Sequence, residues 1–189
     1  MTIIPVGTLP SSISQIRDSL PAAVAKILVN QFKAGTCLIT LPVQWGDLDA
    51  FQHLNNVSTL RYFESARMAH FYQVFQPALE PRVFQDLVHG RNYGPIVKSI
   101  TCSYRSQITF PDTVTLGIRA ESLGSDRFDQ HFLAVSHKQE RIFADGKATI
   151  VMFDYEKQKK AILSPQLVKA LVESNLENER LSLQNTVPK

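Results

Sequence analysis

The chain is poor in cysteine and has no long apolar run. Two cysteines, Cys37 and Cys102, occur among 189 residues, and their spacing fits neither a zinc site nor a redox motif. We therefore expect two buried free thiols in a protein from a reducing compartment. No apolar segment approaches the roughly 18–20 residues that a membrane-spanning helix needs, so the sequence predicts no membrane span.

Several catalytic signatures are missing as well. The sequence has no Gly-x-Ser-x-Gly turn, which argues against a serine hydrolase, and no glycine-rich loop that could bind phosphates. No cluster of histidine and cysteine residues has the spacing of metal ligands. We therefore expect neither a metal nor another cofactor.

The first residues do not resemble a secretory signal peptide, because no basic start precedes a continuous apolar core. Only Arg17 and Lys26 are basic among the first thirty residues, which gives little support to a mitochondrial presequence. We expect an intracellular protein, with the cytoplasm as the first expectation and the mitochondrion as the alternative.

The composition is that of an ordinary globular protein. Hydrophobic residues make up 44% and charged residues 20% of the chain, and its length suffices for one domain with a substantial core. The net charge of +3 is too small to indicate nucleic-acid binding. A mild positive balance also suits an anionic ligand such as a CoA or phosphopantetheine thioester.

Apolar periodicity divides the chain into helices and strands. Pro42 indicates an edge or a bulge in the first strand, the wide apolar surface of the long helix predicts that it is buried, and the polar tail after Asn175 should fray. Five strands around one long helix predict an α+β fold with an antiparallel sheet. The expected helices cover residues 11–33, 56–75, 83–88 and a last helix from Ser164-Pro165, and the expected strands cover residues 36–45, 95–105, 113–123, 127–137 and 140–155.

The segment 43–57 joins the first strand to the long helix and is dense in hydrogen-bonding groups. Two carboxylates, one histidine and two asparagines lie within ten residues: Asp47, Asp49, His53, Asn55 and Asn56. An asparagine at a helix start can cap unpaired amides, and the helix N-terminus carries free N–H groups and partial positive charge. An acid beside such oriented amides suits attack on a carbonyl carbon.

The same segment carries a resemblance to a known family. Residues 45–56 read Trp-Gly-Asp-Leu-Asp-Ala-Phe-x-His-Leu-Asn-Asn, residues 60–67 read Leu-Arg-Tyr-Phe-Glu-x-Ala-Arg, and residues 94–97 read Gly-Pro-Ile-Val. This pattern resembles the hot-dog-fold acyl-CoA thioesterases of the 4-hydroxybenzoyl-CoA thioesterase type. The resemblance covers roughly residues 36–155.

The resemblance implies a hot-dog fold, in which a five-stranded antiparallel sheet wraps around one long central helix. It divides the chain into a helical N-terminal extension (1–35), the thioesterase domain (36–160) and a C-terminal helix with its tail (161–189). The extension should pack on the domain or on a partner subunit. The resemblance also implies a homodimer or homotetramer, whose sheets join edge to edge with each site at the interface. An exposed sheet edge independently favours such pairing.

The resemblance further implies roles for individual residues. Asp49 corresponds to the acid that acts as nucleophile or as base for a water, and the backbone N–H of Asn56 would polarise the thioester carbonyl. The predicted catalytic residues are Asp49, His53 and Asn56, and the predicted substrate-binding residues are Asn55, Val57, Thr59 and Glu64.

Two residues depart from the family pattern. Gln52 stands where many members have glycine, although Gln-His at this point is similar to the plant acyl-ACP thioesterases. Thr59 stands where the helix often carries tyrosine, which would reshape the acyl pocket.

Each site residue also has a purely structural interpretation. Asp49 could cap a turn or the helix start, and His53 could hold the loop instead of orienting substrate or moving a proton. Asp47 fits a structural role, in which it bonds loop amides, and Asn55 fits a helix cap. Glu64, expected in a buried stretch, would need an ion pair with Arg61 or Arg67.

Three functions follow in order of support. The first is hydrolysis of an acyl-CoA or acyl-ACP thioester to acid and thiol. The second is a non-catalytic hot-dog protein that binds acyl thioesters or serves as an assembly subunit, which Gln52 and Thr59 leave open. The third is an enoyl-thioester hydratase or dehydratase with His53 and an acid on either side of the substrate.

Overall fold

The computed structural model describes residues 19–32 and 37–184, and gives only the backbone of residue 32 and of residues 176–184. The first part of the helix expected over residues 11–33 lies outside the described residues. Five strands of the sheet are β1 (Cys37–Pro42), β2 (Tyr93–Tyr104), β3 (Thr113–Glu121), β4 (Arg127–Ser136) and β5 (Arg141–Asp154). The α-helices are α2 (Ala22–Phe32), α3 (Asn56–His70), α4 (Pro81–Val88) and α5 (Pro165–Gln184).

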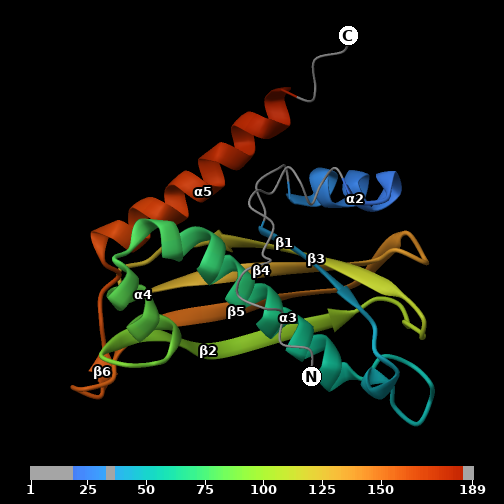
Figure 1. Ribbon diagram of the computed structural model, residues 1–189, viewed down its shortest axis with the longest axis horizontal. Helices are drawn as coiled ribbons and strands as arrows, with labels where there is room; N and C mark the ends of the chain where they lie inside the picture. The colour runs from blue at the N-terminus through green and yellow to red at the C-terminus, as the bar shows by residue number, and fades with distance from the viewer. Residues whose placement is uncertain (1–18, 33–36, 185–189) are drawn as a thin grey trace.

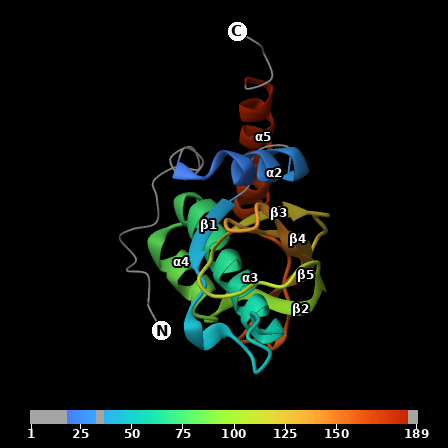
Figure 2. The ribbon, with the colours of Figure 1, turned by 90° about the vertical axis from the view of Figure 1, so that its right-hand side faces the viewer.

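The sheet has the order β1-β3-β4-β5-β2, and all of these pairs are antiparallel. A short strand, β6 (Lys159–Lys160), pairs with β5 and was not predicted. Figure 2 shows the sheet curled around α3, so the predicted hot-dog fold is confirmed. Pro42 closes β1, which is an edge strand as expected. The four later strands begin and end within two residues of their predicted limits.

The main core lies between α3 and the concave face of the sheet (Figure 2). Phe63 of α3 stacks on Phe132 of β4, with ring centroids 4.8 Å apart. Gly146 of β5 allows this close packing, because a Cβ atom there would lie 2.8 Å from Phe63 and 2.2 Å from the carbonyl oxygen of Thr101. The long helix can therefore approach the sheet closely.

A smaller core lies on the opposite face of the sheet, under α2 (Figure 1). Successive residues of a strand point to opposite faces, so Leu133 of β4 packs beneath α2 while Phe132 packs beneath α3. Val24 and Leu28 are the buried residues of α2. This part of the N-terminal segment therefore packs on the sheet of its own subunit.

In β2, the alternation of inward-facing and outward-facing residues is interrupted at one point. Val97 pairs with Ile150 and Ser99 pairs with Thr149, so Lys98 is an extra residue in a β-bulge. The partners of Pro95 and Val97 belong to the main core, and so do the partners of Ile100 and Tyr104. The bulge thus switches the inward-facing positions from odd to even residue numbers.

Two expectations about the helices are wrong. Only one face of α3 is buried within the subunit, because the sheet covers one side of it; Val57 is 57% exposed and the side chain of Glu64 is 64% exposed. The chain does not fray after Asn175, since the backbone stays helical to Gln184 and extends beyond the body of the domain (Figure 1).

The long helix ends close to its expected limit, in an unusual winding. A π-helix over Phe71–Phe75 continues α3, and a 3-10 turn over Gln76–Ala78 follows. None of the helices within residues 19–32 and 37–184 is long and apolar enough to cross a membrane.

His70, the last residue of α3, is 2% exposed. Its ring lies near the rings of Phe71 and Phe75, and burial lowers its pKa from 6.5 to about 4. Between these values the unfolded chain binds a proton that the folded chain does not, so the free energy of unfolding falls as the pH drops. The stability that comes from burying His70 in its neutral form is fully present above about pH 6.5 and is lost progressively towards pH 4.

We expect the wild type to lose about 3 kcal/mol more unfolding free energy than His70→Gln between pH 7 and pH 4. Urea unfolding at a series of pH values measures the difference. His89→Gln, which changes an exposed histidine, is the control and should follow the wild type. Parallel pH profiles for the wild type and His70→Gln would contradict the assignment.

Candidate active site

The loop between β1 and α3 is fixed by backbone hydrogen bonds at its base and on its flank. Leu48 and Leu54 form an isolated antiparallel bridge, and the N–H of Asp49 donates to the carbonyl oxygen of His53 at 2.8 Å. The N–H of Leu54 donates to the carbonyl oxygen of Ile108 at 2.8 Å. Residues 49–53 therefore form a tight turn that is held against the segment after β2.

Asp49 uses one carboxylate oxygen to build this turn. Its Oδ1 accepts the N–H of Phe51 at 2.8 Å and the N–H of His53 at 3.3 Å, which is the local bonding that favours aspartate in turns. Its Oδ2 has no hydrogen-bond partner among the residues that the structure describes. The carboxylate is therefore oriented by the turn and still has one oxygen available.

Asp47 has the structural role that the sequence favours. Its Oδ2 accepts the N–H of Gln44 at 2.9 Å and the hydroxyl of Tyr62 at 2.6 Å, and its carbonyl oxygen accepts the N–H of Asn55 at 2.9 Å. Burial and the Asp47 carboxylate raise the pKa of the Tyr62 hydroxyl, which stays a donor. Asp47 thus joins the start of the loop to the first turns of α3.

The N-terminus of α3 is capped as predicted. The side-chain oxygen of Asn55 accepts the N–H of Val57 at 2.8 Å. Asn56 is the first residue of the helix, so its N–H has no acceptor within the helix. The positive end of the helix dipole lies at the same place. The N–H and the dipole would both stabilise an oxygen atom that gains negative charge.

The structure brings the predicted catalytic residues to one cavity of about 340 Å³. Asp49, His53 and Asn56 line it together with Thr59, whose side chain is buried. The ring of His53 has no hydrogen-bond partner among the described residues. The cavity therefore combines an acid, an imidazole and a helix N-terminus.

Its opposite wall was not predicted and comes from the end of β2 and the residues after it. Tyr104 donates its hydroxyl hydrogen to the carbonyl oxygen of Asn56 at 3.2 Å, which ties β2 to the first turn of α3. Arg105 pairs with Asp145 of β5 at 2.5 Å. The other lining residues of this wall are Ser106, Gln107 and Ile108, together with Phe143 of β5.

Three of the predicted substrate-binding residues do not line this cavity. Asn55 caps the helix start, and Val57 is 57% exposed. Glu64 lies two turns further along α3, where it pairs with Arg67 at 3.4 Å. The predicted ion pair is present, but only the Arg67 side chain is largely buried, at 12% exposed, while the Glu64 side chain is 64% exposed.

Comparison with known proteins identifies the family of the chain. The profile of the thioesterase-like superfamily matches residues 43–171, which include the loop, α3 and the whole sheet after β1. The chain belongs to the thioesterase-like superfamily. Family membership supports thioester hydrolysis in general.

Individual relatives are distant. The uncharacterised protein YsmA of Bacillus subtilis (strain 168) is 22% identical over 116 residues, which cover 61% of this chain and 70% of YsmA. A 1,4-dihydroxy-2-naphthoyl-CoA thioesterase from Synechocystis superposes with a TM-score of 0.63 at 14% identity, over 74% of this chain and 97% of that one. The Staphylococcus aureus protein SAV2348, solved in complex with CoA, superposes with a TM-score of 0.65 at 10% identity, over 76% and 85% of the two chains. These two structures share the fold.

The departure at Gln52 has a backbone consequence. Gln52 has a φ of 62°, a left-handed conformation that costs a residue with a side chain roughly 1–2 kcal/mol. Glycine adopts this conformation without that cost, which gives a physical reason for the glycine that many thioesterases have here. The loop of this chain keeps the turn in spite of the strain.

Gln52→Gly should raise the free energy of unfolding by about 0.5–1 kcal/mol, because relief of the strain exceeds the extra flexibility of the unfolded chain. Ala50→Gly is the matched control in the same loop, where φ is not positive, and it should lower stability by roughly 0.4–1 kcal/mol. Chemical unfolding measures both. A loss of stability in Gln52→Gly similar to that of Ala50→Gly would show that the turn carries no such strain.

Proposed function

We propose that the protein hydrolyses an acyl-CoA, or a related acyl thioester, to a free acid and a thiol. The observation that carries this proposal is the cavity lined by Asp49 and by Asn56 at the N-terminus of α3. An acid with one free carboxylate oxygen and a residue with an unpaired helix amide both line this cavity. This pair supplies an attacking group and an oxyanion donor for a thioester carbonyl.

Asp49 acts through Oδ2 in one of two ways. As a nucleophile, Oδ2 bonds to the carbonyl carbon, the carbon–sulfur bond breaks, and the thiolate leaves with the electron pair; water then hydrolyses the anhydride and restores the carboxylate. As a general base, Oδ2 takes a proton from the water that attacks the carbonyl carbon. In both routes the N–H of Asn56 donates to the carbonyl oxygen as it becomes negative.

His53 and Thr59 complete the site. His53 lines the same cavity as Asp49, and its imidazole can protonate the leaving thiolate or orient the thioester. Thr59 forms part of the inner wall, where a tyrosine of other members would leave less space for the acyl group. Asn55, Val57 and Glu64 remain proposed contacts at the margin of the site.

The proposed substrate is a thioester, in which an acyl group is attached to CoA or to ACP. The CoA complex of SAV2348 and the 1,4-dihydroxy-2-naphthoyl-CoA thioesterase of Synechocystis support a CoA ester. The Gln-His pair at residues 52 and 53, which is similar to the plant acyl-ACP thioesterases, supports an ACP ester. We propose residues 36–160 as the catalytic domain, with helical additions before and after it. A non-catalytic acyl-thioester-binding protein is the second candidate, because Gln52 and Thr59 differ from the family pattern.

Asp49→Asn keeps the acceptor oxygen for the turn but removes the charge. We expect kcat to fall by at least about 10³-fold, a barrier increase of about 4 kcal/mol, while KM changes much less. Release of free thiol from a panel of acyl-CoAs measures both constants. An enoyl-CoA hydration assay on the same protein tests the dehydratase alternative.

Asp47→Asn is the matched control, because it changes the other acid of the loop. It should lower the melting temperature, since the Tyr62 hydroxyl loses a charged acceptor, and it should lower kcat much less than Asp49→Asn. Activity of Asp49→Asn within tenfold of the wild type would remove Asp49 from the mechanism and pass the role to His53.

The unpaired edge of β2 supports assembly into a homodimer. β2 has 12 residues, and among the described residues its one partner strand is β5. Ile96 and Val97 on it are 39% and 40% exposed. A long edge with exposed apolar side chains favours pairing with a second copy. Because Tyr104 of β2 lines the cavity, such a dimer places the site next to the subunit interface.

The protein should therefore elute as a dimer or larger species at micromolar concentration. Ile96→Glu should shift it towards the monomer, because a charge would be buried at the new strand pair. Val172→Glu, which changes an exposed apolar residue of α5, is the control and should leave the mass unchanged. Size-exclusion chromatography with light scattering measures the mass, and a monomeric wild type would rule out this assembly.

A further inference from the structure

The wall that the thioester cavity takes from the segment after β2 has few backbone hydrogen bonds. Ser106, Gln107 and Ile108 of this segment line the cavity. Within the part of the chain that the structure describes, the backbone of residues 107–111 makes two hydrogen bonds. The carbonyl oxygen of Ile108 accepts the N–H of Leu54 at 2.8 Å, and the carbonyl oxygen of Gln107 accepts a side chain from another part of the sheet. The position of this wall therefore depends on a small number of contacts.

Gln139, in the turn between β4 and β5, supplies that side chain. Its Nε2 donates to the carbonyl oxygen of Gln107 at 2.6 Å. Its Oε1 accepts the hydroxyl hydrogen of Ser106 at 3.3 Å and the Nε–H of Arg141 at 2.9 Å. A carbonyl oxygen can only accept and a guanidinium can only donate, so these partners fix the orientation of the amide. One side chain thus holds two successive residues of the wall.

The turn that carries Gln139 is anchored by a buried acid. The N–H of Gln139 donates to Oγ of Ser136 at 3.0 Å, and the Ser136 hydroxyl donates to Oδ2 of Asp112 at 2.5 Å. Oδ1 of Asp112 accepts the N–H of Lys138 at 3.0 Å. Ser136 is fully buried and Asp112 is 9% exposed, and hydrogen bonds are stronger where water is excluded. The Gln139 side chain therefore extends from a fixed base.

This hairpin reaches the loop between β1 and α3 by two routes. At the start of the loop, the N–H of Val43 donates directly to the carbonyl oxygen of Asp112 at 2.9 Å. Near the end of the loop, the route runs from Gln139 through the wall to the N–H of Leu54. Only the second route uses the Gln139 side chain. A single substitution can therefore separate the two.

We propose that Gln139 is a positioning residue of the thioester cavity, which fixes the place of Ser106 and Gln107 relative to Asp49. This inference rests on the proposed function. Gln139 is not among the residues that line the cavity, so it acts on the thioester only through the wall. A wall that moves by about 1 Å misplaces the thioester carbonyl, and a misplacement of that size can cost about 10²-fold in rate.

Gln139→Leu keeps the approximate size of the side chain and removes all three contacts of its amide. Hydrogen exchange followed by NMR should be faster at the Leu54 N–H by about tenfold or more, because its acceptor is no longer held in place. The Val43 N–H should keep its wild-type rate, since Asp112 still accepts it. An unchanged rate at Leu54, or equal acceleration at both amides, would overturn the inference.

The same variant should lower kcat/KM by about tenfold or more on an acyl-CoA that the wild type hydrolyses, measured well below its melting temperature. A purely structural role would lower the melting temperature and leave kcat/KM of the folded protein unchanged, and that result would also overturn the inference. If Gln139→Leu fails to fold, Gln139→Glu decides. It keeps the acceptor for Ser106 and Arg141, loses the donor to Gln107, and should show the same pattern at pH 7.

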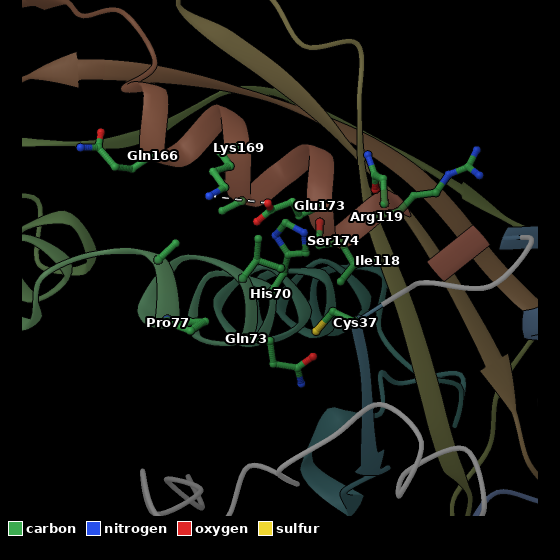
Figure 3. Close-up of a pocket in the computed structure, with 14 residues that line it drawn as sticks. Cys37, His70, Gln73, Pro77, Ile118, Arg119, Gln166, Lys169, Glu173 and Ser174 are labelled. Atoms are coloured by element: carbon green, nitrogen blue, oxygen red, sulfur yellow. Dashed lines mark ion pairs between the residues drawn. The ribbon is translucent and has the colours of Figure 1, made fainter. Parts of the chain in front are cut away.

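Gln166→Leu is the matched control, because it makes the same exchange away from the thioester cavity. Gln166 of α5 lines a larger cavity of about 470 Å³ at the other end of α3 (Figure 3). The 15 residues of α3 place that end about 22 Å from Asn56 at 1.5 Å per residue. This variant should keep both exchange rates and kcat/KM. A wild type that hydrolyses no thioester would refute the proposed function, and the exchange rates at Leu54 and Val43 would then decide the positioning role by themselves.

Discussion

The burial of one face of α3 against the curled sheet is the interaction on which the rest of the molecule depends. Phe63 stacks on Phe132, and the missing side chain of Gly146 lets the helix come close enough for that contact. Burial of aromatic side chains is a large source of stability. Once the middle of α3 is fixed in this way, its two ends are fixed as well. The first end brings Asn56 to the cavity that Asp49 also lines, and the second end places the His70 ring near Phe71 and Phe75.

At the first end, two aspartates two residues apart have different tasks. Asp47 gives its carboxylate to Gln44 and Tyr62 and so joins the loop to the helix. Asp49 gives only Oδ1 to the turn and keeps Oδ2. The structural and catalytic interpretations of Asp49 are therefore compatible, because a carboxylate has two oxygens. The turn orients the group that we propose to react.

Much of the fold could be predicted from the sequence, because its signals are local. Alternation gave the four later strands, helical periodicity gave α3, and Asn55 stands at the cap position. The long-range features could not be predicted in the same way. The exposure of Glu64 depends on which face of α3 meets the sheet, and the inward position of Tyr104 depends on the bulge at Lys98. Counting by twos from Pro95 and Val97 turns Arg105 inward instead of Tyr104.

Because of the bulge at Lys98, the effect of a deletion in β2 depends on its position in the strand. Removal of Lys98 leaves every residue of β2 with its partner on β5, because Val97 and Ser99 already pair with neighbouring residues. Removal of a residue between Ser99 and Tyr104 shifts the remainder of the strand by one position and turns it to the other face. The hydroxyl of Tyr104 then leaves the carbonyl oxygen of Asn56. Among homologous chains, length variation in this strand should therefore concentrate at the bulge and be absent from the six residues that follow it.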